Sequence, residues 1–164
     1  MTKDEFNEVF VYSDGKLFWK LSPHPRIKIG QEAGTYTSGY IHIEFLKKVW
    51  KAHRIIWIMH FGEIPEGMVI DHIDGNGTNN HINNLRLATR QENSRNVNKR
   101  KNSKSKYKGV SWHAGQQKWN AVIQVDGTRH HIASFSTEEE AHKAYCEVAE
   151  MIFGKFVNKG NNNE

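Results

Sequence analysis

The sequence predicts an α+β fold made of two small domains. Of its 164 residues, 37% are hydrophobic and 25% are charged, which is the composition of a globular protein. Short runs of alternating apolar and polar residues, typical of strands, occur together with a few runs of helical periodicity. Residues 96–106 contain one apolar residue and separate two such segments. We therefore expect a first domain over residues 1–98, a basic linker over 99–104 and a second domain over 105–160.

The first fifty residues predict hairpins, and a buried helix is expected to follow them. β-branched and aromatic residues alternate in three short runs, at 9–12, 17–19 and 40–43. Apolar residues then crowd the segment from Val49 to Phe61, which Gly62 and Pro65 end. This segment is long enough for a helix and too apolar to be exposed, so a buried helix is predicted there.

The next part of the chain predicts the order strand, loop, strand, helix. Residues 68–72 and 85–88 form two short apolar runs, separated by a loop rich in Gly and Asn. Thr89 and Glu92 have the spacing of a capping box, in which each side chain accepts a hydrogen bond from the backbone of the other residue. A helix is therefore expected to begin near Arg90.

Asp71, His72 and Asn93 lie at the ends of these elements and form the candidate chemical site. One carboxylate and one amide supply the oxygen ligands that a hard cation such as Mg²⁺ prefers. A neighbouring histidine can deprotonate water near neutral pH. These groups suffice for phosphodiester hydrolysis. A single histidine is more often a surface or structural residue, so the catalytic interpretation of His72 depends on its neighbours.

Other metal sites fit the sequence poorly. A calcium loop that starts at Asp71 or Asp74 would need a glutamate at its twelfth position, where the chain has Ile82 or Leu85. The single cysteine, Cys146, excludes a cysteine-rich zinc site and an internal disulfide. The Asn and Gly residues of the loop can also be explained by turns alone.

After the linker, the sequence predicts three strands and one helix. The helix is expected to start within residues 136–140 and to end at Gly154. Asp126 and Gly127 form a dipeptide that strongly favours a hairpin turn. The three strand-like runs are 107–112, 118–125 and 129–135.

The positive charge of the protein is concentrated in one stretch. The net charge is +5, yet the segment from Asn93 to Val125 contains eight basic residues and no acid. Such a block attracts a polyanion through counterion release, and nucleic acid is the usual one in a cell. A solvated linker with incidental lysines is the alternative. No run of about 18 apolar residues and no secretory signal occur, so a cytoplasmic protein without a membrane partner is expected.

Residues 52–93 resemble the HNH endonucleases of phages and mobile introns. The motifs that carry the resemblance are Ala52–Trp57, Val69–Asn76, Asn79-Asn80, Asn83–Arg86 and Glu92-Asn93. The resemblance implies a ββα-metal fold in which His72 is the general base. It also implies that Asp71 and Asn93 bind one divalent cation.

The same resemblance assigns roles to three further residues. Asn84 is expected to tie the loop with its amide and so hold His72 in orientation. His53 and Arg54 belong to the pattern and are expected either to pack in the core or to contact phosphate. Because Asn93 stands where other branches of the family have histidine, Mg²⁺ or Mn²⁺ is favoured over zinc.

Residues 105–159 resemble the AP2 DNA-binding domain, in which a sheet enters the major groove. The motifs are Tyr107–Val110, Lys118-Trp119 with Ala121 and Ile123, Phe135–Ala141, Ala144-Tyr145 and Phe153–Phe156. The candidate DNA contacts are Lys108, Trp112, Lys118, Trp119, Gln124, Arg129 and His131. Packing against the helix is the alternative for the two tryptophans. Ser111 and Gln124 stand where plant members of the AP2 family commonly have arginines. The DNA sequence that those plant proteins bind can therefore not be assigned to this protein.

The sequence as a whole predicts a monomeric endonuclease that hydrolyses double-stranded DNA with Mg²⁺ or Mn²⁺ and no small-molecule cofactor. The expected ends are 5′-phosphate and 3′-hydroxyl, and the expected setting is a phage or other mobile element inside its host cell. One alternative is an AP2-type DNA-binding regulator with an inactive nuclease remnant. Another is a protein that binds RNA or DNA by charge alone. The intact set of Asp71, His72, Asn84 and Asn93 favours the enzyme.

Overall fold

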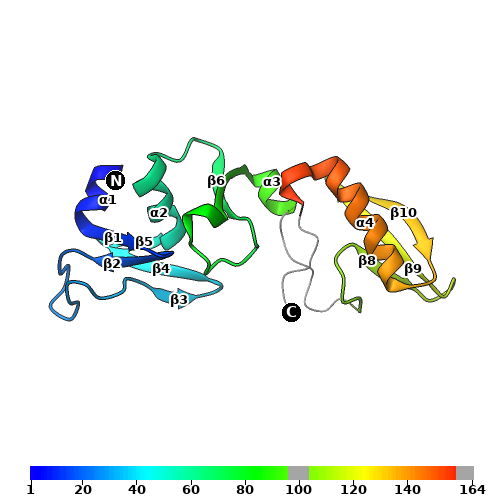
Figure 1. The fold of residues 1–164 in the computed structure, drawn as a ribbon, viewed down its shortest axis with the longest axis horizontal. Coiled ribbons are helices and arrows are strands. Elements are labelled where there is room, and N and C mark those ends of the chain that lie inside the picture. Colours follow the sequence, from blue (N-terminus) through cyan, green and yellow to red (C-terminus); the bar gives the residue numbers. More distant parts are fainter. Residues whose placement is uncertain (96–103, 158–164) are drawn as a thin grey trace. The chain divides into compact units, whose positions relative to one another are not determined.

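The computed structural model describes residues 1–95 and 104–157, which belong to two compact units. The first unit is Met1–Asn93, and the second begins at Ser94. Both combine helices with small antiparallel sheets, which confirms the predicted mixed α and β architecture (Figure 1). The predicted linker, except for Lys104, lies outside the described residues. Within the described residues, no helix has both the length and the apolar character of a membrane span.

The first unit opens with a helix that the sequence analysis did not predict, α1 (Lys3–Val9). Its capping box is formed by Thr2 and Glu5: the Thr2 hydroxyl accepts from the Glu5 N–H, and a Glu5 carboxylate oxygen accepts from the Thr2 N–H. Phe6 is fully buried and anchors α1 in the core. The helix leads directly into the hairpin of β1 (Phe10–Ser13) and β2 (Lys16–Trp19).

A three-stranded sheet and one helix complete the core of this unit. The strands are β3 (Thr35–Thr37), β4 (Tyr40–Phe45) and β5 (Lys48–Lys51), in the order β3-β4-β5. Helix α2 (Ala52–Phe61) follows β5 without a loop and lies beside α1 (Figure 1). Ile55 and Ile56 of α2 are completely buried.

The predicted start of the buried helix at Val49 is wrong. Residues 48–51 form strand β5, in which Val49 lies opposite Glu44 and the helix begins only at Ala52. The reason is the turn before it: Leu46 and Lys47 both have positive φ, 52° and 58°, a pair of values that reverses the chain into a tight hairpin. The backbone of residues 48–51 therefore bonds to β4 and not to itself.

The predicted order strand, loop, strand, helix is present in the second half of this unit. The elements are β6 (Met68–His72), a 3-10 turn (Ile82–Asn84), β7 (Leu85–Thr89) and α3 (Arg90–Arg95). β6 and β7 pair antiparallel. Thr89 and Glu92 make both bonds of the predicted capping box, at 2.8 and 3.1 Å, and the helix begins at Arg90 as predicted.

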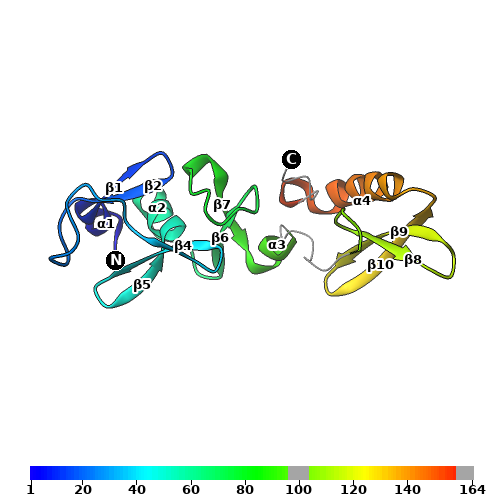
Figure 2. The same cartoon turned by 90° about the horizontal axis from the view of Figure 1, so that it is seen from below.

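The second unit is a three-stranded antiparallel sheet covered on one face by a long helix (Figure 2). Its elements are β8 (Val110–His113), β9 (Lys118–Val125), β10 (Thr128–Phe135) and α4 (Glu138–Phe153). Asp126 and Gly127 form the predicted turn, with φ values of 51° and 82°. Ala121 and Ile123 of the sheet and Tyr145 of α4 form the core.

Candidate functional site

Strand pairing places Asp71 and His72 at the end of β6, opposite Arg86 and Leu85 of β7. Asp71 is buried, with 3% of its surface exposed. Arg86 donates from both Nε and Nη2 to the same oxygen, Oδ2 of Asp71, each at 2.8 Å. This charge-assisted contact fixes the direction of the carboxylate. Arg86 was not predicted as a site residue, although pairing the two predicted strands would have placed it across from Asp71.

The ring of His72 is held by a second residue that has no predicted role, Asn80. Nε2 of His72 lies 2.9 Å from Oδ1 of Asn80, and both residues are at most 5% exposed. An amide oxygen only accepts hydrogen bonds, so this contact requires the proton of the neutral imidazole to be on Nε2. Nδ1 is then the basic nitrogen of His72. Asn80 therefore selects the tautomer as well as the orientation of the ring.

Asn84 closes the loop between β6 and β7. Its Nδ2 donates to Oδ1 of Asp74 at 2.9 Å and to the Asn79 carbonyl at 2.8 Å, while its Oδ1 accepts from the Asp74 N–H at 3.1 Å. Burial opposes ionisation of Asp74, but hydrogen bonds from Asn76, Asn84 and Asn79 outweigh it and lower the pKa of the carboxyl. These contacts support the predicted role of Asn84 in tying the loop.

Two rings from other elements pack against His72. His53, in the first turn of α2, meets it edge to face with 4.8 Å between ring centroids. Tyr40 of β4 lies 5.5 Å from the His53 ring and 6.1 Å from the His72 ring. Burial, and then the charges of neighbours that include His72 and Lys51, lower the pKa of His53 to about 3. His53 is thus a neutral packing partner of His72 at physiological pH, which favours the core role over phosphate contact.

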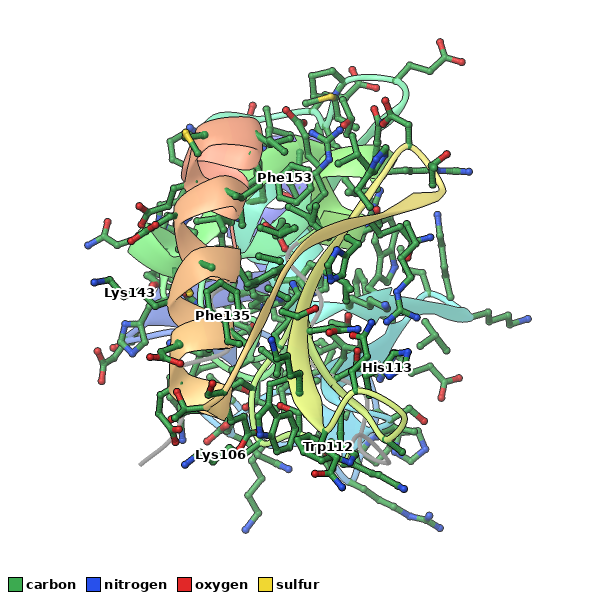
Figure 3. The ribbon with its side chains drawn as sticks, turned by 90° about the vertical axis from the view of Figure 1, so that its right-hand side faces the viewer. Lys106, Trp112, His113, Phe135, Lys143 and Phe153 are labelled. Carbon is green, nitrogen blue, oxygen red and sulfur yellow. The ribbon has the colours of Figure 1, made fainter. Side chains whose placement is uncertain are left out.

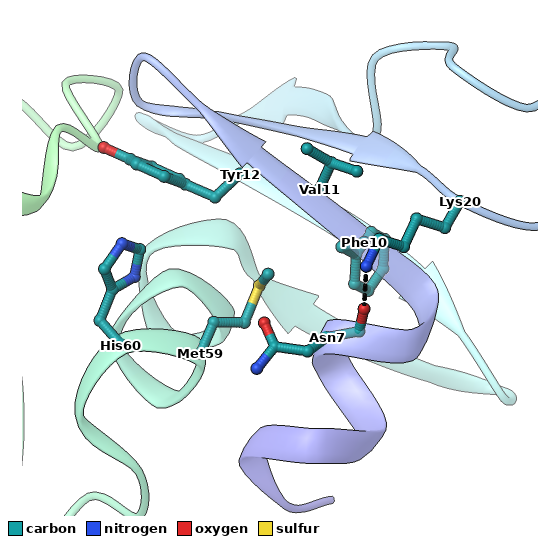
Figure 4. Close-up of a pocket in the computed structure, with 7 residues that line it drawn as sticks. All are labelled: Asn7, Phe10, Val11, Tyr12, Lys20, Met59 and His60. Atoms are coloured by element: carbon teal, nitrogen blue, oxygen red, sulfur yellow. Dashed lines mark hydrogen bonds between the residues drawn. The ribbon is translucent and has the colours of Figure 1, made fainter.

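The loop is also anchored to the first hairpin through Tyr12. The Ile82 N–H donates to the Tyr12 hydroxyl at 3.1 Å. Tyr12 lines a pocket of about 310 Å³ that contains none of the predicted site residues (Figure 4). Two of the lining residues are joined by a hydrogen bond from Lys20 Nζ to the Asn7 carbonyl, at 2.6 Å (Figure 4). Tyr12 thus connects the loop to the lining of this pocket.

The predicted metal ligands are Asp71 and Asn93. Asn93 is half-buried in α3, the helix that directly follows β7. In the part of the chain that the structure describes, no three His, Cys, Asp or Glu side chains are grouped as a metal site. Of the predicted pair, only Asp71 is one of these four residue types. The carboxylate oxygens of Asp71 and the amide oxygen of Asn93 fit a hard cation such as Mg²⁺ or Mn²⁺.

In the second unit, alternation along the strands separates a core face from an outer face. Val110, Ala121 and Ile123 are buried beneath α4. Gln124 and Arg129 lie opposite each other on the outer face and are both exposed. By the same alternation, His131 and Lys118 also belong to the exposed outer face. Four of the seven predicted DNA contacts thus share one surface.

The two tryptophans belong to the other face of the sheet from these four residues. Trp112 and Trp119 face each other across β8 and β9, with ring centroids 5.1 Å apart. They lie two residues from Val110 and Ala121 and so belong to the α4 side, where Trp119 packs against the core. Figure 3 shows Trp112 beside His113 at one end of the sheet, and Phe135 next to α4. This placement favours the packing alternative for Trp119, while Trp112 stays 40% exposed.

Lys108 is the seventh predicted DNA contact of the second unit, and Arg54 is the predicted phosphate contact of the first unit. Lys108 is half-buried just before β8, and this burial lowers its pKa to about 8. Arg54 is half-buried in the first turn of α2, next to His53.

Known families match the two parts of the chain separately. Residues 51–95 match the family model of the HNH endonucleases, and residues 105–155 match the model of the AP2 domain. Protein 3.8 of Escherichia phage T7 is 40% identical over 91 residues, which cover 54% of this chain and 75% of that protein. No solved structure gives a significant match.

Two further relatives carry the nuclease name. An uncharacterised HNH endonuclease of Acanthamoeba polyphaga mimivirus is 40% identical over 106 residues, 64% of this chain and 54% of that protein. YosQ of Bacillus subtilis, named as a candidate HNH homing endonuclease from the SPbeta prophage, is 32% identical over 95 residues, 57% of this chain and 55% of that protein. The chain therefore spans little more than half the length of these two relatives.

Proposed function

Since this chain belongs to the HNH endonucleases and carries an AP2 domain in its second unit, we propose that it hydrolyses double-stranded DNA with the help of Mg²⁺ or Mn²⁺. The observation that carries the proposal is the burial and fixed orientation of the His72 ring. Its ring is buried, fixed by Asn80 through Nε2 and adjacent to Asp71, so its basic Nδ1 is presented in one orientation. A general base has to be positioned in this way before its pKa matters.

In the proposed reaction, Nδ1 of His72 removes a proton from water as the water oxygen attacks phosphorus. The bond between phosphorus and the 3′-oxygen of the preceding nucleotide breaks, and this oxygen takes up a proton from solvent water, which gives a 5′-phosphate and a 3′-hydroxyl. Asp71 and Asn93 would hold the divalent ion, whose chemistry when bound is to polarise the phosphate and stabilise the leaving oxygen. Arg86 keeps the Asp71 carboxylate in place through its two bonds to Oδ2.

Targeting is proposed for the outer face of the second unit's sheet. Lys118, Gln124, Arg129 and His131 place charged and amide groups on one exposed surface, which suits contacts to phosphates and base edges in a major groove. We propose that the protein acts as a monomer in a mobile element, in line with the homing name of the Bacillus subtilis relative.

The proposal is tested by incubating supercoiled plasmid with the protein and Mg²⁺, with an EDTA control. The expected result is relaxed or linear DNA only when Mg²⁺ is present, with ends that DNA ligase can rejoin without prior phosphorylation. Sequence-specific binding without any cleavage would overturn the proposal and support the DNA-binding regulator with a nuclease remnant.

A further inference from the structure

Two cations without ion-pair partners flank His53 along the chain, and the His53 ring packs against the catalytic histidine. Lys51 ends β5, and Arg54 lies three residues later in the first turn of α2. Among the described residues, neither takes part in an ion pair, whereas Lys16 is paired with Glu32 and Arg86 with Asp71. Charge left uncompensated at the edge of a buried site attracts an anionic ligand.

Lys51 lies on the face of the sheet that leads to the catalytic site. It pairs with His42 across β4 and β5, and strand alternation therefore places Tyr40, His42 and Lys51 on the same face. The Lys51 ammonium sits 3.8 Å above the centroid of the Tyr40 ring. Since that ring is 6.1 Å from the His72 ring, the ammonium is less than 10 Å from the His72 ring. Successive phosphates of one DNA strand are ~3.4 Å apart along the helix axis, so this distance corresponds to at most about three nucleotides.

Tyr40 is a fixed platform for this cation. Gly77, in the loop between β6 and β7, packs directly on the Gly39 carbonyl and the Tyr40 ring. A Cβ at Gly77 would lie 2.8 Å from two ring carbons. The Tyr40 ring also contacts His53, which is 5% exposed. The lysine head group thus lies over a ring that contacts both the loop between β6 and β7 and His53.

We propose that Lys51 and Arg54 form a phosphate-binding subsite of the nuclease unit, which holds the backbone of the DNA strand that His72 attacks. The inference rests on the proposed function and adds a separate anchor for the scissile strand, distinct from the sheet of the second unit. His53 is buried and lies between the two cations along the chain. The subsite aligns the strand without reading its bases, because ammonium and guanidinium groups contact phosphate oxygens in any sequence.

The test uses a control that the same strand provides. Lys48 carries the same charge in β5, but it lies two residues from Trp50, over whose ring its ammonium sits at 4.1 Å, and so belongs to the opposite face of the sheet from Lys51. Binding of a fluorescent DNA duplex to the full chain is measured in EDTA, at several salt concentrations, for wild type, Lys51→Gln and Lys48→Gln.

The subsite predicts that Lys51→Gln weakens binding about five- to tenfold at 0.1 M salt and makes the slope of log affinity against log salt shallower by about 0.9. Lys48→Gln should stay within twofold of wild type, and Lys51→Arg should restore the affinity. Equal weakening by Lys51→Gln and Lys48→Gln would show a general effect of net charge and overturn the inference. If Lys51→Gln does not fold, Arg54→Gln decides the matter by the same comparison with Lys48→Gln.

Failure of this inference can be told apart from failure of the proposed function. Wild-type protein that cleaves plasmid while Lys51→Gln binds duplex normally refutes the subsite alone. Wild-type protein that binds duplex but never cleaves refutes the proposed function, and the binding comparison still decides whether the phosphate subsite exists.

Discussion

His53 should make the first unit lose stability as the pH falls, and His53→Phe should remove most of that loss. Burial lowers the pKa of His53 in the folded protein from 6.5 to about 3. Below pH 6.5 the unfolded chain binds a proton at this residue that the folded chain does not bind. The unfolded state is therefore favoured increasingly as the pH drops from 6.5 towards 3. Phenylalanine keeps a ring beside Tyr40 and His72 but does not titrate.

The size of the effect follows from the two pKa values. They differ by about 3.5, and each pH unit between them corresponds to about 1.4 kcal/mol, so the full loss is about 5 kcal/mol. Because His53 is only 5% exposed, solvent screens little of this effect. Between pH 7 and pH 5, wild type should lose about 2 kcal/mol more than His53→Phe.

The assay is urea unfolding of both proteins at pH 7, 6 and 5, followed through hydrogen exchange of the buried α2 amides, which report on the first unit. His24→Gln is the control, since His24 is exposed in the same unit and should leave the pH dependence of wild type unchanged. The explanation is refuted if wild type and His53→Phe lose stability in parallel, or if the His53 ring titrates near pH 6.5 in the folded protein.

The other variants separate metal binding, loop closure and packing. Asp71→Ala and Asn93→Ala should raise the Mg²⁺ concentration needed for half-maximal cleavage or abolish cleavage, with duplex binding in EDTA retained; an unchanged Mg²⁺ titration would contradict their role. Asn84→Ala removes three hydrogen bonds within the loop and should lower the free energy of unfolding by about 1–3 kcal/mol. Both the melting temperature and the cleavage rate should therefore fall. A melting temperature equal to that of wild type would argue against a structural role. Gly109→Ala should destabilise the second unit by about 2 kcal/mol or more, because φ is 74° and the new Cβ would meet the Tyr145 ring; unfolding at the wild-type urea concentration would contradict this.

Local signals in the sequence predicted much of the fold. The capping box of Thr89 and Glu92 located the start of α3, and Thr2 and Glu5 carry the same signal for α1, which the sequence analysis did not use. The boundary between β5 and α2 was not predictable in this way. It depends on positive φ at Leu46 and Lys47, residue types that rarely adopt it, so the apolar run beyond them was predicted as helix.

The candidate site was predictable where its residues are close in sequence or share a motif. Asp71 and His72 were predicted from the residues themselves, and the motif added Asn84. Arg86 required the register of two strands, and Tyr40 reaches His72 only through tertiary folding. The AP2 resemblance made the tryptophans candidate DNA contacts, with packing against the helix as the alternative. Counting alternate residues from Val110 and from Ala121 assigns them to the helix-covered face.

The central claim, that His72 is the base of a DNA-cleaving site, is tested most directly by His72→Ala. Plasmid cleavage in Mg²⁺ and duplex affinity in EDTA are measured for this variant, for His24→Gln and for wild type. The rate with His72→Ala should fall by a factor of about 10² to 10⁴, because the base acts on water, while its DNA affinity stays within about twofold of wild type. Cleavage by His72→Ala at close to the wild-type rate would contradict the assignment.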